Sequence, residues 1–221
     1  QANSRAGSVN LDTGLSLNGQ ADTAVTGMAD RMAQARQLVL AGANGTLSSA
    51  DRETLAKQLD GIAAELDSLV GRLGANGQPV FSASAALSVR YDTNTVLAPV
   101  PSRAEVFDVS GVSLSQMASD AATALRSAVP ATIAASLNAL DLGLAHTADV
   151  LGDIGQRGAR LQSMQDASRV QDIDFAAERS SLESTDLSEA IALLHAQTLT
   201  LDAAQAAFAR INRRTLFDVL S

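Results

Sequence analysis

The sequence predicts a mainly α-helical fold: an elongated antiparallel helical bundle, or coiled-coil rod, that carries a small β-rich insert. Three observations support this prediction. Apolar residues recur at steps of three and four residues over most of the chain, as they do on one face of a helix. Hydrophobic residues make up 46% of the sequence and aromatic residues only 3%, so the apolar bulk comes from Ala, Leu, Val and Ile, which suit closely packed helices. Only four prolines are present to interrupt them.

Residues 1–77 are predicted to form an N-terminal helical hairpin of the rod. The apolar period is strongest over Gly14–Gly42. The first helix is predicted to end after this run, because Gly42, Asn44 and Gly45 tolerate positive φ. Ser48 precedes Asp51 by three residues, the spacing of a capping box, and so opens a second helix. That helix should stop around residues 71–77, which are rich in glycine. A short turn between two amphipathic helices predicts an antiparallel pair.

Residues 78–112 change character and are predicted to form the small β-rich insert. Short runs of β-type residues occur at Pro79–Phe81, Leu87–Tyr91, Thr95–Leu97 and Val106–Val109. The insert is too short to bury a core of its own, so it should lean on the helices.

Residues 113–181 are predicted to supply the C-terminal rod helices, with Pro130 in the first turn of a long one. Gly152, Gly155 and Gly158 weaken that helix by about 1 kcal/mol each relative to Ala, which packing against neighbouring helices must offset.

Residues 182–221 are predicted to form a terminal coiled-coil helix, capped at its start by Ser184 and Thr185. Apolar residues follow alternating four- and three-residue steps here, the spacing of a heptad seam. The stretch also runs in apolar residues to the chain end, where an isolated domain would fray into polar ones. It could complete an intramolecular bundle, but its wide apolar surface favours subunit interaction. The residues predicted to make that contact are Leu187, Ile191, Leu194, Leu201, Phe208, Ile211, Leu216, Phe217 and Leu220.

Composition excludes several functional classes. The absence of cysteine removes thiol catalysis and cysteine-ligated metals, and a formal net charge of −8 argues against a nucleic-acid partner. No apolar run approaches the roughly 20 residues that span a bilayer, so no membrane partner is expected. Gln1 follows no initiator Met and no signal peptide, so we expect that the chain was trimmed there or its native start removed.

Catalytic and metal chemistry find little support in the sequence. The two histidines, His146 and His195, stand far apart on predicted helices, where a lone histidine is seldom a ligand. Asp172 and Asp174 are two residues apart, and a helix points such a pair in different directions. We therefore expect no catalytic residue, no metal and no cofactor, and we read the aspartates as a charged segment at a helix junction.

Two runs resemble the bacterial flagellins and their hook-associated relatives. The turn Asn44–Arg52, which reads Asn-Gly-Thr-Leu-Ser-Ser-Ala-Asp-Arg, resembles the turn that these proteins share. The runs Leu182–Ile191 and Ala203–Phe208 resemble the C-terminal helix of the whole superfamily. With both helical blocks included, the resemblance covers most of the chain.

Two further runs resemble the branch of this family that joins the hook to the filament, the flagellar hook-associated protein 3 type. Gly74–Phe81 is similar to the helix-to-β transition of that branch. The ending Thr215–Leu220, Thr-Leu-Phe-Asp-Val-Leu, resembles its Ser-Leu-Phe ending, whereas flagellins tend to close on a leucine-rich run.

The resemblance implies a non-enzymatic, extracellular subunit of the bacterial flagellum, exported by the type III apparatus. Its implied partners are the flagellar hook protein, flagellin or another hook-associated protein, further copies of itself in a ring, and an export chaperone. It also implies that residues 182–221 are weakly ordered or prone to aggregate in a free monomer, since half of their partners come from other subunits.

Two departures from the family pattern modify this expectation. The family's N-terminal segment, with its Gly-Lys-Arg motif, is not found before Gln1, so we expect the terminal helix to lack its usual partner. The β-rich insert is shorter than the family usually carries, so we expect a reduced outer domain. Two alternatives remain open: a flagellin filament subunit, and a non-flagellar helical adaptor or signalling bundle.

Overall fold

The computed structural model describes residues 2–74, 77–91 and 95–217, with the side chains of residues 2–5, 185, 186 and 212–217 excepted. The chain divides into two compact units, residues 1–168 and residues 169–221. Its helices are α1 (Ala2–Gly42), α2 (Ser49–Val70), α3 (Arg103–Phe107), α4 (Leu114–Ser127) and α5 (Pro130–Phe217), and its strands are β1 (Val89–Arg90), β2 (Val96–Leu97), β3 (Asp108–Val109) and β4 (Val112–Ser113). The mainly α fold with a small β-rich insert is thereby confirmed.

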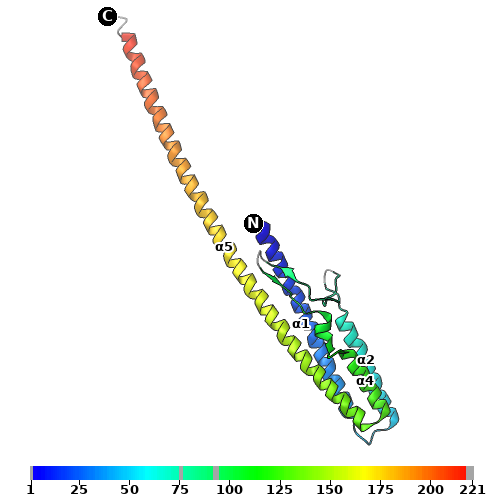
Figure 1. The fold of residues 1–221 in the computed structure, drawn as a ribbon. Coiled ribbons are helices and arrows are strands. Elements are labelled where there is room, and N and C mark those ends of the chain that lie inside the picture. Colours follow the sequence, from blue (N-terminus) through cyan, green and yellow to red (C-terminus); the bar gives the residue numbers. More distant parts are fainter. Residues whose placement is uncertain (1, 75–76, 92–94, 218–221) are drawn as a thin grey trace. The chain divides into compact units, whose positions relative to one another are not determined.

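Unit 1 is a helical bundle in which α1, α2, α4 and the first part of α5 run alongside one another (Figure 1). α1 and α2 run in opposite directions, and so do α4 and the first part of α5, as the short turn within each pair requires. Gly143 lets α5 come close to α1, because a side chain there would collide with the end of Met32. The core lies between these helices and consists of fully buried aliphatic and methionine side chains, among them Val25, Met28, Met32, Leu59, Leu66, Leu114, Leu125, Leu140 and Ile154.

The chain starts with two helices, α1 and α2, that are joined by a short turn, and the capping box predicted at Ser48 is present. The Ser48 Oγ accepts from the Asp51 backbone N at 3.1 Å, and the Ser48 backbone N donates to the Asp51 carboxylate. The first helix begins at Ala2, so it extends beyond the Gly14–Gly42 run in which the apolar period is strongest. Gly14 lies inside this helix, and its lack of a side chain leaves room for the ring of Tyr91, against which a Cβ would collide.

The β-rich insert contains less strand than the sequence predicted. Its two hairpins are antiparallel, with Val89 opposite Leu97 and Asp108 opposite Ser113. Ser110 and Gly111 have φ of 53° and 84°, the left-handed pair that closes a two-residue hairpin.

The predicted strand at Pro79–Phe81 was wrong, and only the second half of the predicted run Val106–Val109 is a strand, since Asp108 and Val109 form β3. Val106 and Phe107 belong to α3, because Ser102 caps that helix and Glu105 completes a capping box. Hydrogen bonds from the Ser102 backbone and side chain lower the pKa of Glu105, so its carboxylate stays charged in this role. Pro79 forms only an isolated bridge with Leu73, since a proline has no N–H to continue a ladder.

The arm formed by residues 89–91 and 95–99 is tied to α1 and α5. The Asn10 Nδ2 donates to the Arg90 carbonyl at 2.8 Å, and the Arg157 Nη1 donates to the Ala98 carbonyl at 2.9 Å. Tyr91 completes a second small core with Leu11 and Leu161. The arm therefore leans on the helices, as its length predicted.

The long helix begins at Pro130, as predicted, but no separate helix begins near residue 182. α5 is continuous to Phe217, so the predicted cap at Ser184 and Thr185 was wrong. The Ser184 hydroxyl instead donates to the Ser180 carbonyl within the helix at 2.8 Å. Asp172 and Asp174 likewise lie inside α5 and not at a helix junction.

Candidate assembly surface

As far as residue 217, unit 2 consists of the last part of α5, and this described part holds no second element on which its apolar side chains could pack. Six of the predicted contact residues are described there, and all are exposed. Their exposed fractions run from 48% for Ile191 to 67% for Phe208, with Leu187, Leu194, Leu201 and Ile211 between these values. Exposed apolar side chains of this size along one helix make it a candidate interaction surface.

The remaining predicted contact residues cannot be placed on this surface. Leu216 and Phe217 are in the last turn of α5, but their side chains lie outside the described part of the chain. Leu220 lies outside the described residues altogether.

Charge is nearly absent from the middle of this surface. Between Ile191 and Ala209, Asp202 is the only residue that is charged at neutral pH, if His195 is neutral. His195 and Asp202 are seven residues apart, so they share one flank of the helix. A solvated helix normally carries charges on most of its circumference, so this composition favours burial against other helices.

Hydroxyl groups on the same helix do not disturb the apolar surface, because they bond back to their own backbone. The Thr198 Oγ1 donates to the Leu194 carbonyl at 3.0 Å, and the Thr200 Oγ1 donates to the Ala196 carbonyl at 2.8 Å. Ser188 does the same toward Ser184 at 3.0 Å. These groups need no further partner and can be covered by another helix at little cost. Small residues leave a shallow groove of about 400 Å³ there, lined by Ala196, Gln197, Thr200, Leu201 and Ala204.

Exposed apolar side chains begin on α5 before residue 182, where the terminal helix was predicted to start. Val170, Ile173 and Phe175 are 58%, 67% and 56% exposed, although Val170 and Ile173 continue the apolar stripe that is buried at Leu161. The spacing of apolar residues alone does not distinguish a stripe that is buried against other helices from one that is exposed. The exposed set also includes Leu182, Leu193 and Leu199.

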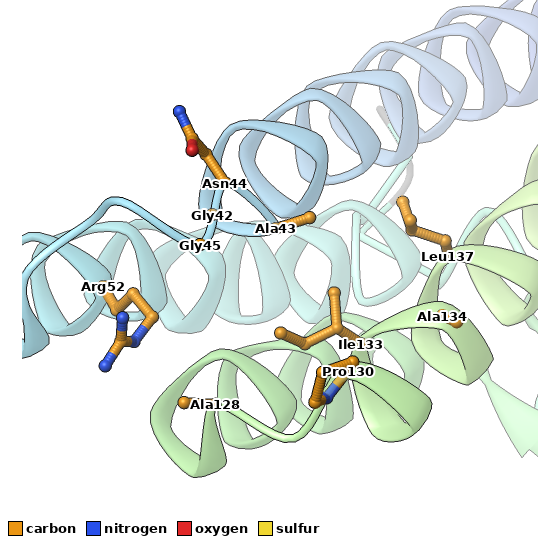
Figure 2. A pocket seen from close by; sticks show the side chains of 10 residues that line it. All are labelled: Gly42, Ala43, Asn44, Gly45, Arg52, Ala128, Pro130, Ile133, Ala134 and Leu137. Atoms are coloured by element: carbon orange, nitrogen blue, oxygen red, sulfur yellow. The ribbon is translucent and has the colours of Figure 1, made fainter.

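Unit 1 has a pocket of about 210 Å³ where the α1–α2 turn faces the start of α5 (Figure 2). Its wall is apolar at Ile133, Ala134 and Leu137. Arg52 is the one charged lining residue, and its Nη1 donates to the Leu47 carbonyl at 2.6 Å. The guanidinium thus holds the turn in place, and the pocket presents no catalytic arrangement.

The two histidines are not brought together by the described fold. The His146 Nε2 lies 3.2 Å from the Val106 carbonyl oxygen, which ties α5 to α3. His195 is exposed on α5. Within the described ranges, no three histidine or acidic residues group closely enough to hold a metal ion. Nor does any described helix contain a stretch long and apolar enough to cross a membrane.

Solved structures of other proteins share the fold of this chain. A protein described as a flagellar hook-associated protein from Vibrio parahaemolyticus superposes with a TM-score of 0.70 at 19% sequence identity, over 78% of this chain and 88% of that one. FlgL from Bacillus cereus superposes with a TM-score of 0.65 at 11% identity, over 78% of this chain and 93% of that one. Flagellin from the same organism superposes with a TM-score of 0.54 at 17% identity, over 72% and 88%.

The chain has the fold of the hook-associated proteins and flagellins. At these identities the likeness establishes the fold, and it agrees with the resemblance noted in the turn and terminal helix. No protein-family model matches the sequence, and no curated protein matches it. The fold is therefore shared with these structures at sequence identities of 11–19%.

Proposed function

We propose that this chain is a structural subunit of the bacterial flagellum, of the class that joins the hook to the filament. The observation behind the proposal is the exposed, almost uncharged apolar surface of unit 2 on a flagellin-like fold. Residues 187–211 pack against helices of neighbouring subunits, and this burial holds the subunit in the assembly. Burying apolar surface contributes about 25 cal/mol per Å², so a row of leucine-sized side chains supplies a substantial driving force.

The ending Thr215–Leu220 supports the junction role over filament growth, through its resemblance to the junction branch. In that role the partners are the hook protein on one side, and flagellin or another hook-associated protein on the other. Further copies of the chain complete a ring, and an export chaperone covers the apolar helix before assembly. The subunit works outside the cell and needs no cofactor, metal or catalytic residue.

The test is a pair of matched variants in a strain that lacks the native gene. Ile191→Asp with Leu194→Asp places two charges in the apolar surface, whereas His195→Asp places a charge on the polar flank one residue away. We expect the double variant to be exported but not incorporated, which leaves hooks without filaments and free flagellin in the medium. The His195→Asp strain should carry normal filaments. Normal filaments from the double variant, seen by electron microscopy, would contradict the proposal.

Two further measurements separate the alternatives. A filament subunit would extend purified filament seeds without help, whereas a junction subunit would not. The flagellin likeness, with a TM-score of 0.54, makes this comparison necessary. A cytoplasmic adaptor would stay in the cell fraction and be missing from sheared extracellular material.

A further inference from the structure

The dipeptide Asn-Gly occurs three times in the chain, at Asn18, Asn44 and Asn76. In an unfolded peptide the three would have similar chemistry, because glycine offers no side chain to hinder attack by its own amide nitrogen on the preceding side chain. Asn76 lies outside the described residues. The other two occupy contrasting surroundings, and the contrast decides their reactivity.

Asn18 is protected by the fold. Its side chain is 8% exposed, and its Nδ2 donates to the Pro99 carbonyl at 2.9 Å and to the Ile154 carbonyl at 3.0 Å. Gly19 follows inside α1, where its N–H belongs to the helix hydrogen-bond ladder. Neither the amide nitrogen nor the side-chain carbon can move toward the other without breaking α1.

Asn44 has the opposite surroundings. It lies in the turn between α1 and α2, and both Asn44 and Gly45 are exposed. Figure 2 shows the Asn44 side chain directed away from Pro130 and Ile133 across the pocket. No acceptor among the described residues engages the Gly45 N–H. The nitrogen that would attack is therefore not held in any helix or sheet ladder.

Hydrogen bonds from Thr46 make the side-chain carbonyl carbon of Asn44 more electrophilic. The Asn44 Oδ1 accepts from the Thr46 backbone N at 3.2 Å and from the Thr46 Oγ1 at 2.9 Å. Two donors on one amide oxygen draw electron density from Cγ, and they stabilise the negative charge that develops on that oxygen during attack. The same two contacts fix the Asn44 side chain against the backbone of its own turn.

We propose that Asn44–Gly45 is a site of spontaneous covalent modification, at which Asn44 converts to aspartate and isoaspartate. The Gly45 nitrogen gives up its proton and bonds to the Asn44 Cγ, and the Cγ–Nδ2 bond breaks with release of ammonia, which leaves a succinimide ring. Water then opens the ring. Cleavage at Cγ gives aspartate, and cleavage at the backbone carbonyl gives isoaspartate. The net change is the consumption of one water and the release of one ammonia.

Both products alter the turn. Each adds a negative charge at the rim of the pocket that Arg52 also lines. Isoaspartate also adds a methylene to the main chain shortly before Ser48, the residue that caps α2. The modification therefore acts on a helix start that packs against α4, and it does not depend on the proposed assembly role.

Trypsin places the three dipeptides in different peptides, which makes the test direct. Asn44 is the only asparagine in residues 37–52, Asn76 is the only one in residues 73–90, and Asn18 falls in residues 6–31. The folded chain is held at physiological temperature and slightly alkaline pH, then digested and analysed by mass spectrometry, with isoaspartate identified by enzymatic methylation. We expect the mass of peptide 37–52 to rise by the difference between an amide NH₂ group and a hydroxyl group, while Asn18 stays intact. In urea, Asn18 and Asn44 should react at comparable rates. Equal rates in the folded chain would overturn the proposal.

Three variants isolate the contributing groups. Gly45→Ala slows the reaction by hindering the nucleophile, and the fold tolerates it because a Cβ there meets nothing within 4 Å. Thr46→Val removes the hydroxyl donor and should slow the reaction, whereas Thr46→Ser should restore it. A Thr46→Val chain that reacts at the parent rate would show that the hydroxyl plays no part.

Asn44-Gly45-Thr46 also fits the acceptor pattern for an N-linked glycan, which gives the experiment a second reading. Peptide 37–52 also contains Thr46, Ser48 and Ser49, so fragmentation must locate any added sugar. A sugar-sized mass increase located on Asn44 in protein from its natural source would mean that a glycan occupies this residue, and it would overturn the spontaneous route there.

Discussion

Tyr91 carries a buried hydroxyl that has no hydrogen-bond partner in the described part of the chain. Its side chain is 4% exposed, and the hydroxyl rests against α1, where a Cβ on Gly14 would lie 2.5 Å from it. A buried hydroxyl without a partner costs about 1–3 kcal/mol, whereas the ring itself packs on Leu11 and Leu161. We expect Tyr91→Phe to raise the free energy of unfolding by about 1 kcal/mol, measured by urea denaturation. A less stable variant would mean that the hydroxyl has a partner.

The ionisation of the same residue gives a separate prediction. Burial raises the pKa of Tyr91 from 10.0 to about 12, because the phenolate would lose its solvation. The pKa is higher in the folded than in the unfolded state, so this contribution to stability is complete below pH 10 and is lost as pH rises toward 12. Tyr91 is the only tyrosine and the chain has no tryptophan, so phenolate absorbance reports this residue alone. A titration midpoint near that of a free tyrosine would contradict the predicted burial.

At the scale of elements, the glycines of α5 illustrate what the sequence could not supply. Gly152, Gly155 and Gly158 looked equivalent, each a weakness that packing must offset. In the structure a Cβ on Gly152 or Gly155 meets nothing within 4 Å, whereas one on Gly158 would lie 2.6 Å from the Asn18 Oδ1. Of these three glycines, only Gly158 therefore serves a close approach between helices, as Gly143 does earlier in α5.

This difference predicts opposite effects for the same substitution. Gly152→Ala should stabilise the chain by about 1 kcal/mol, because alanine favours a helix. Gly158→Ala should destabilise it by about 1–3 kcal/mol, because Asn18 is fixed by two hydrogen bonds and cannot move aside. Urea denaturation of the two variants measures whether the free energy of unfolding rises for Gly152→Ala and falls for Gly158→Ala. If Gly158→Ala is also stabilising, the contact with Asn18 is not close enough to matter.

Helix starts show where local sequence suffices and where it does not. The capping box at Ser48 was predictable because the serine and its partner lie three residues apart beside a glycine-rich turn. The equivalent box at Ser102 was overlooked, since β-type residues follow it. At Ser184 a favourable cap pattern was overridden, because α5 continues through it and the hydroxyl bonds back to Ser180. A cap motif predicts a helix start only where the preceding chain leaves the helix.

For the whole molecule, the bundle was predictable because apolar periodicity and turn residues agree along unit 1. The apolar stripe along α5 was predictable, but its exposed part was not, because the sequence does not show where an apolar stripe lacks a partner. Leu161 is 1% exposed and Ile173 is 67% exposed, yet both follow the same spacing. Burial depends on how far the neighbouring helices extend, and that is a property of the tertiary structure.

This contrast between the units predicts how the free chain is digested. Unit 2 is a single helix with no partner within that unit, and an unpacked helix opens at low free energy. Limited trypsin treatment should therefore cut first after Arg169 and Arg179, while Arg157, bonded to the Ala98 carbonyl, stays protected in unit 1. Mass spectrometry of the first fragments identifies the sites. Early cleavage within unit 1 would contradict the prediction, and protection of Arg179 in assembled flagella but not in free protein would locate the buried surface that we propose.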